Sequence, residues 1–155
     1  MDIQKRNNII SAVLIIVIIG LGYWLYRSIV DPYQKVLRSK AMTKEVHTRM
    51  SNIRSVLIKY KNRKQNFPPS LDSLVVFLKT DSVIKAQGAS LFKKTIGHYN
   101  PDSLIYSPRP PHHEFYYARN DTSNPQLYLL RDPDDSTNTI GSLTQTTLLN
   151  AASWE

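Results

Sequence analysis

The chain has 155 residues, with 20 Lys or Arg against 12 Asp or Glu, so its formal net charge is +8. It contains no cysteine, which excludes disulfides, thiol nucleophiles, iron–sulfur clusters and cysteine-bound zinc. The positive excess favours contact with anionic lipid headgroups or another polyanion, although a basic, solvated helix beside a membrane explains it more simply.

The first element is an uncharged apolar run, IISAVLIIVIIGLGYWLY, from Ile9 to Tyr26. As a helix it is about 27 Å long, so the sequence predicts a single-pass transmembrane anchor over residues 9–30, after a short basic N-terminus over residues 1–8. A cleaved signal peptide is the alternative, but the run is longer than usual and no small-residue cleavage site follows it. The residues expected at the membrane interface are Tyr23, Trp24, Tyr26 and Arg27.

The charges that flank this run leave its orientation open. Lys5 and Arg6 precede it, whereas a larger set of basic residues follows it, so a plain positive-inside count puts the C-terminal part in the cytoplasm. A short basic segment directly before an apolar run is, however, also typical of an uncleaved export signal. The basic residues that follow are Arg27, Lys35, Arg38, Lys40 and Lys44.

A second helical segment, a stalk or spine, is predicted over residues 31–66. It has no Gly or Pro between Tyr33 and Lys64, and Pro32 fits either a first turn or a kink. Apolar residues recur at spacings of four and three, which gives the helix one face to bury. Two interpretations stay open: the stripe packs on its own domain, or it binds other subunits. Its residues are Val46, Met50, Ile53, Leu57 and Tyr60.

A small head is predicted over residues 67–155. Phe67-Pro68-Pro69 ends the helix, because a residue before proline is pushed out of the helical region and proline donates no N–H. Ser70 fits the N-cap of a short helix, LDSLVVFLK.

Beyond this helix, aromatic and β-branched runs alternate with Pro, Asn and Asp. Phe115–Ala118 and Gln126–Leu130 read as an antiparallel hairpin, and Leu104–Tyr106 as a further strand. The predicted fold class is therefore α+β: a transmembrane helix continues into a stalk helix that packs on a small antiparallel sheet.

This order of elements resembles a type IV pilin or a type II secretion pseudopilin, most closely the G-type head. The resemblance rests on the stretch IKYKNRKQNFPPSLDSL, with its aromatic–proline corner and Ser-Leu-x-x-Leu helix, and on FYYARND…QLYLLRDPDD…IGSL for the strands and acidic loop. It implies a pilin-like fold, a short cytoplasmic N-terminus and an exported head.

The N-terminus departs from that family. Prepilin peptidase substrates carry a Gly–Phe cleavage site and a Glu five residues into the mature chain. Here Asn7-Asn8-Ile9 and an uncharged span stand in their place, so the cleavage motif is lacking. The resemblance therefore concerns the head architecture rather than N-terminal processing.

An acidic loop offers one candidate metal site. Asp132, Asp134 and Asp135 gather oxygen donors after a strand, and the G-type pseudopilins use a C-terminal acidic loop for calcium. A metal-free turn is the alternative, because Asp, Pro, Ser and Asn are ordinary turn formers and the loop lacks the Gly and bidentate Glu of an EF-hand.

No sequence motif indicates catalysis. There is no Gly-rich phosphate loop, nucleophile elbow or HExxH, so we expect no enzyme, no small-molecule substrate and no cofactor apart from possible calcium. Nucleic-acid binding, which uses Lys and Arg with interleaved aromatics, is not expected either, since the basic residues here lie on a juxtamembrane helix.

The sequence thus predicts a non-enzymatic, single-pass structural component of an envelope secretion or filament assembly in a bacterial inner membrane, with a periplasmic head. Its expected partners are membrane lipid and other envelope proteins, including further copies of itself, through Val46, Met50, Ile53 and Leu57. The alternative is a small accessory subunit that stabilises a larger membrane enzyme or transporter complex.

Overall fold

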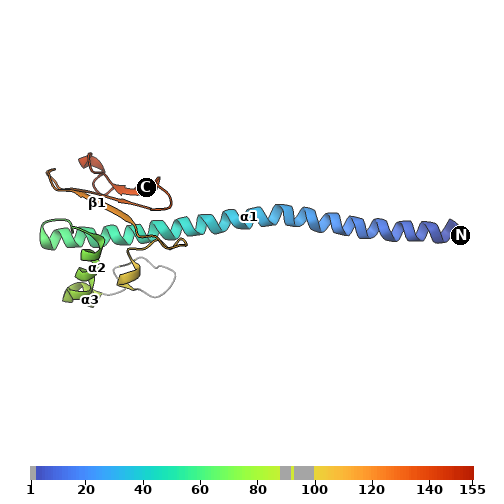
Figure 1. Ribbon diagram of the computed structural model, residues 1–155, viewed down its shortest axis with the longest axis horizontal. Coiled ribbons are helices and arrows are strands. Elements are labelled where there is room, and N and C mark those ends of the chain that lie inside the picture. The colour runs from blue at the N-terminus through green and yellow to red at the C-terminus, as the bar shows by residue number, and fades with distance from the viewer. Residues whose placement is uncertain (1–2, 88–91, 93–99) are drawn as a thin grey trace. The chain divides into compact units, whose positions relative to one another are not determined.

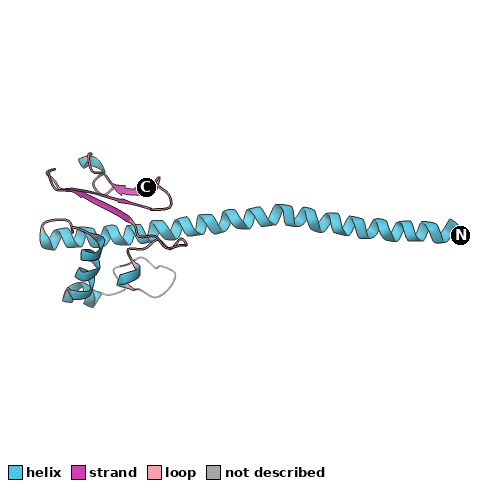
Figure 2. Cartoon of the chain, viewed as in Figure 1, coloured by secondary structure: helices cyan, strands magenta, loops and turns pink. Residues whose placement is uncertain are grey.

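The computed structural model describes residues 3–87, 92 and 100–155. The chain divides into two compact units, Met1–Ala41 and Met42–Glu155. The fold is α+β, as predicted, with helices first and strands later in the chain (Figure 2). In chain order its elements are α1 (Ile3–Lys64), α2 (Leu71–Thr80), α3 (Ser82–Gln87), η2 (Pro101–Ser103), β1 (Tyr116–Asn120), β2 (Leu127–Arg131), β3 (Thr139–Gly141) and η3 (Thr146–Leu148).

The first unit consists of the N-terminal part of α1. This part contains Pro32 within the helix and, near the N-terminus, a run long and apolar enough to cross a membrane. Its large apolar side chains are exposed, with Ile16 at 69% and Ile19 at 66%. A helix that is apolar all round needs cover from lipid or from other helices.

In the second unit the remainder of α1 is the spine of the hydrophobic core. Figure 1 shows the sheet and α2 on opposite sides of this part of the helix. The Tyr60 ring meets Phe77 of α2 edge to face at 5.0 Å, and Phe67 lies 4.7 Å from Tyr128 of β2. The C-terminal part of α1 and the corner after it therefore pack against both α2 and the sheet.

The corner after α1 is fixed by contacts with the hairpin. Gln65 has φ +65° and its N–H bonds to the Lys61 carbonyl at 2.7 Å, which closes the helix in a left-handed turn. Arg119 donates to the Phe67 carbonyl at 2.8 Å, and the Tyr117 hydroxyl donates to the Pro68 carbonyl at 2.9 Å. The Phe67 and Pro68 carbonyls lie beyond the end of the helix and have no helical partners, and side chains of β1 satisfy them.

Helix α2 begins where the sequence predicts. The Ser70 hydroxyl accepts the N–H of Ser73 at 3.3 Å, which confirms the N-cap. The apolar face of the helix is buried, while Val76 on the opposite face is 57% exposed. The buried residues of α2 are Leu71, Leu74, Val75, Phe77 and Leu78.

The sheet has the order β1-β2-β3 and is antiparallel throughout. Tyr117 pairs with Leu130, and Leu130 with Ile140, so alternate side chains of neighbouring strands lie on one face and are directed into the core. Gly141 has φ +83°, and a Cβ there would come within 2.3 Å of the Tyr128 carbonyl oxygen. The close approach of β2 and β3 therefore requires glycine at this position.

The predicted hairpin is confirmed, with strand ends one or two residues later than expected. The strand predicted at Leu104–Tyr106 is reduced to a single bridge between Tyr106 and Glu114. The third strand is instead β3, whose Ile140 pairs with β2 and also bridges to Ala152 near the C-terminus. Leu104 and Ile105 lie instead in the turn that follows η2, where the Leu104 N–H bonds to the Pro101 carbonyl at 3.3 Å and the Tyr106 N–H to the Ser103 carbonyl at 3.3 Å.

Candidate functional site

The apolar stripe predicted to bind other subunits lies inside the head. The side chains of Val46, Met50, Ile53 and Leu57 are each 0% exposed, within a core cluster formed with α2 and the sheet. Side chains that are fully buried in the core of the head have no exposed surface with which to contact another subunit. Of the two interpretations that the sequence leaves open, the structure supports packing on the chain's own domain.

The aromatic residues predicted at the membrane interface lie on α1 and are exposed: Tyr23 at 63%, Trp24 at 70% and Tyr26 at 64%. Arg27 follows them and makes an i,i+4 ion pair with Asp31 at 3.3 Å. Amphipathic rings followed by a long cation are the composition that suits the headgroup level of a bilayer.

The acidic loop after β2 is organised around one buried carboxylate. The Asp132 side chain is 0% exposed; one oxygen lies 3.5 Å from the Arg109 guanidinium and accepts the Asn138 amide N–H at 3.3 Å. The Asp132 N–H also bonds to the Asn138 carbonyl at 3.0 Å, which closes the loop. A buried carboxylate with a guanidinium beside it already has its countercharge.

The other two carboxylates of the loop have separate partners. Asp134 Oδ1 lies 2.8 Å from His113 Nδ1, and Asp135 accepts the Thr137 hydroxyl at 2.6 Å and its N–H at 3.1 Å. These bonds, first that of the hydroxyl and then that of the N–H, lower the pKa of Asp135. Asp135 thus acts as a turn-forming residue, whereas Asp134 links the loop to His113.

Calcium binding would need several of these oxygens to point at one centre. Across residues 3–87, 92 and 100–155, no group of three His, Cys, Asp or Glu side chains is placed to hold a metal ion. The arginine beside Asp132 would also repel a cation. In the arrangement described, the three carboxylates of this loop face different protein groups and do not converge on one centre.

The buried polar network continues from this loop to α1 and the C-terminus. Asn138 uses its amide N–H on Asp132, so its Oδ1 is free to accept from His47 Nε2 at 2.8 Å. The His47 ring stacks on Trp154, with centroids 3.9 Å apart and planes 2° from parallel. Sequence reasoning missed this arrangement, because the three partners lie far apart in the chain and no local motif joins them.

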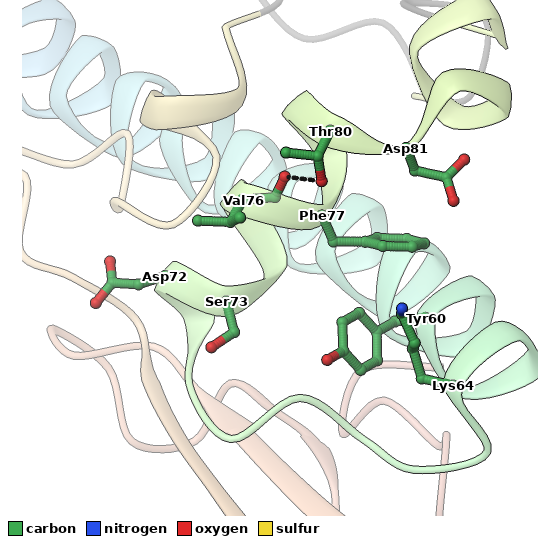
Figure 3. A pocket seen from close by; sticks show the side chains of 8 residues that line it. All are labelled: Tyr60, Lys64, Asp72, Ser73, Val76, Phe77, Thr80 and Asp81. Atoms are coloured by element: carbon green, nitrogen blue, oxygen red, sulfur yellow. Dashed lines mark hydrogen bonds between the residues drawn. The ribbon is translucent and has the colours of Figure 1, made fainter.

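A groove lies between α1 and α2 on the surface of the head, and Figure 3 shows the side chains that line it. Its floor is formed by the Tyr60 and Phe77 rings, and its rim carries exposed Val76 together with charged groups of both signs. It has no paired nucleophile and base, so an apolar floor with a mixed charged rim suits contact with a protein segment. The lining residues are Tyr60, Lys64, Asp72, Ser73, Val76, Phe77, Thr80 and Asp81.

Comparison with known proteins gives no match to a family model, to a curated protein or to a solved structure. The long N-terminal helix with its apolar run and the small antiparallel sheet are compatible with a pilin-like fold. No homologue supports assigning the chain to that family.

Proposed function

We propose that this chain is a single-pass membrane protein that serves as a structural, non-enzymatic subunit of a pilin-like envelope assembly. One observation carries the proposal: the apolar run of α1 is exposed on all sides, with Ile16 at 69% and Trp24 at 70%, while the same helix is the buried spine of the head. So large an apolar surface is stable only in a bilayer or against other helices.

In this proposal the head supplies the surface for protein partners. Since the stripe of α1 is used in the head's own core, the groove between α1 and α2 is the better candidate. Val76 is an apolar side chain on the otherwise polar outer face of α2, and it lines the same groove as the Tyr60 and Phe77 rings. An exposed apolar group beside buried aromatics is the usual composition of a protein contact.

We further propose that the N-terminus is cytoplasmic and that the head lies in the periplasm of a bacterial inner membrane. The resemblance to pseudopilins supports this orientation, and a cysteine-free head is compatible with an oxidising compartment.

Protease protection tests the topology. Full-length protein is expressed, and an antibody against the head is used because a C-terminal tag would disturb the contacts of Glu155. The head should be digested in spheroplasts and protected in intact cells. A head protected in spheroplasts would be cytoplasmic, and the pilin-like proposal would then fail.

The intact mass of the membrane-bound protein tests the anchor in the same preparation. The full 155 residues are expected, whereas a shorter chain released from the membrane would identify the apolar run as a cleaved signal.

Site-specific photocrosslinking tests the partner surface. A crosslinker at Val76 should give adducts in cells, and one at Leu148, which is 42% exposed elsewhere on the head, is the matched control. An adduct of twice the monomer mass, or with another envelope subunit of similar size, supports the assembly. An adduct with one large membrane enzyme or transporter would instead support the accessory-subunit alternative.

A further inference from the structure

The segment of α1 that follows the apolar run has two faces. Arg27, Asp31, Lys35 and Arg38 follow the spacing i, i+4, i+8 and i+11, which places them on one side of an α-helix with 3.6 residues per turn. The segment is therefore amphipathic directly after the point where the apolar run ends.

The opposite side of the same segment carries exposed apolar residues as far as Leu37, and Lys40, which lies seven residues after Tyr33, ends this apolar side. Ile29 is 63% exposed, Tyr33 61% and Val36 51%, and Leu37 on the edge of this face is 42% exposed. Within residues 3–41, neither the charged side nor the apolar side of this segment is covered by another part of the chain.

The basic side chains of this segment are largely without countercharge. Within the part of the chain that the structure describes, Lys35, Arg38 and Lys40 make no ion pair and no hydrogen bond. Arg27 forms an ion pair with Asp31 at 3.3 Å, and the two charges cancel, so this pair adds no net charge to the segment. Three unpaired cations within six residues thus give the segment a strong local positive potential.

A cation of this segment can contact lipid headgroups only if it lies close enough to the end of the apolar run. With 1.5 Å of rise per residue, Lys35 lies about 13 Å along the helix from Tyr26, and Arg38 about 18 Å. The polar headgroup layer is about 5–7 Å thick on each side of the hydrocarbon core, and Lys and Arg side chains add several Å of reach. Lys35 can reach the outer headgroup layer from an upright helix, and Arg38 can reach it from a tilted one.

Pro32 gives the helix a place to bend between the apolar run and these cations. It lies inside α1, where it has no N–H for the Ser28 carbonyl, and the missing bond makes this turn the natural position for a bend. A bend here would bring the segment down onto the membrane surface, with Tyr33 and Val36 toward the acyl boundary and the basic face toward the headgroups.

We propose that residues 27–40 bind the headgroups of anionic phospholipids, with Lys35 and Arg38 as the principal phosphate contacts. This inference rests on the membrane anchor of the proposed function, because the bilayer must hold the segment at its surface. A phospholipid is the occupant that the charges favour, since the patch is cationic and its position directly after the apolar run puts it beside phosphodiesters in either orientation of the chain.

Native mass spectrometry of the full-length protein tests the proposal. The protein is released from mild detergent after incubation with equal amounts of phosphatidylglycerol and phosphatidylcholine, and the retained lipids are counted. Wild type should retain more phosphatidylglycerol. In the variant K35Q/R38Q that preference should fall about fivefold for each charge removed, and it should weaken in wild type as salt is raised.

The control variant R63Q/K79Q removes the same two residue types from exposed ion pairs of the head, with the same loss of net charge. It should keep the wild-type preference for phosphatidylglycerol. Equal retention of both lipids by wild type, or an equal loss in the two double variants, would overturn the proposal. A loss of self-association in K35Q/R38Q with unchanged lipid retention would also overturn it, and would assign the segment to a second copy of the chain.

Carbonate extraction of membranes from the same cells separates this inference from the proposed function. If wild type and both variants stay in the membrane but show no lipid preference, only the headgroup inference fails. If wild type is extracted by carbonate, the membrane anchor itself fails.

Discussion

Arg54 of α1 donates two parallel hydrogen bonds, of 2.9 and 2.7 Å, to the carboxylate of Glu155, which lies 101 residues further along the chain. It also donates to the Asn150 carbonyl at 3.0 Å, and its side chain is only 18% exposed. The hydrogen bond to Glu155 raises the pKa of Arg54. The C-terminal segment is thereby fastened to the helix that forms the spine of the head, so one side chain links the two ends of the second unit.

Replacing this arginine by lysine should weaken the head. Lysine keeps the charge but lacks the planar fork, so Arg54→Lys is expected to lower the free energy of unfolding by about 1 kcal/mol. Arg63→Lys is the matched control, since the Arg63 side chain is 43% exposed and donates a single hydrogen bond to Asp81, and the change should alter stability by less than about 0.5 kcal/mol. Urea unfolding in a Trp24→Phe background measures both, because Trp154 is then the only tryptophan. Equal midpoints for the two variants would contradict the role given to Arg54.

Calcium should not bind to the acidic loop and so should not change the stability of the head. Because its three aspartates face different protein partners, neither millimolar calcium nor a chelator should move the unfolding midpoint of the full-length protein. A stabilisation that saturates with calcium and is lost in Asp134→Asn would show that the loop rearranges to bind the ion.

Asp132 should contribute far more to the stability of the head than Asp135 does. Asp132→Ala leaves Arg109 and Asn138 without their buried partner and should cost about 3 kcal/mol. Asp135→Ala removes a turn contact at the surface and should cost about 1 kcal/mol or less. The difference in urea midpoint between the two variants measures this contrast, and similar losses would show that Asp132 has no special place in the network.

The elements with local signals were predictable from the sequence, and those formed by distant contacts were not. The Phe67-Pro68-Pro69 corner, the Ser70 cap and the hairpin depend on residues a few positions apart, so propensity and capping locate them within one or two residues. β3 has only three residues and gains its partners from β2 and from the C-terminal segment. No periodicity can develop over such a length.

The candidate sites also divide into features that a local sequence pattern shows and contacts that join residues far apart in the chain. The pattern of the α1 stripe shows that one face is buried but not by what, so the choice between core and partner needed the packing with α2 and the sheet. The aspartates of the loop are visible in the sequence, whereas the arginine that neutralises Asp132 comes from position 109. The stacking of His47 on Trp154 likewise joins residues that no local motif connects.

Two adjacent positions on α1 separate core packing from partner contact. Leu57 is 0% exposed, so Leu57→Ala should lower the free energy of unfolding by about 3 kcal/mol through lost burial and the cavity left behind. Ile58 is 36% exposed, so Ile58→Ala should change it by less than about 1 kcal/mol. Urea unfolding of the detergent-solubilised protein, repeated at two protein concentrations, checks both. A loss for Leu57→Ala that disappears at the lower concentration would indicate that the stripe is buried between subunits.

The head should lose stability at alkaline pH because two tyrosine hydroxyls are buried in it. Desolvation is the main cause that raises the pKa of both Tyr117 and Tyr128 above the ordinary value of 10.0. In the folded head both hydroxyls donate hydrogen bonds, to the Pro68 carbonyl and to Asn150 Oδ1. A tyrosine with a raised pKa stays protonated in the folded state while the unfolded chain ionises, so its stabilising contribution is complete below pH 10 and is lost as the pH rises above it.

For Tyr128 the slope is up to about 1.4 kcal/mol for each pH unit above 10. Tyr128→Phe removes this ionisation, so its stability should fall less steeply with pH than that of wild type, although the lost bond to Asn150 costs about 1 kcal/mol at neutral pH. Tyr106→Phe, at a side chain that is 42% exposed, is the matched control for removal of a hydroxyl. Urea midpoints between pH 8 and 11 measure the slopes, followed in the Trp24→Phe background by Trp154 fluorescence with tyrosinate absorbance in parallel. Identical slopes for Tyr128→Phe and Tyr106→Phe would show that the buried hydroxyl does not control the alkaline transition.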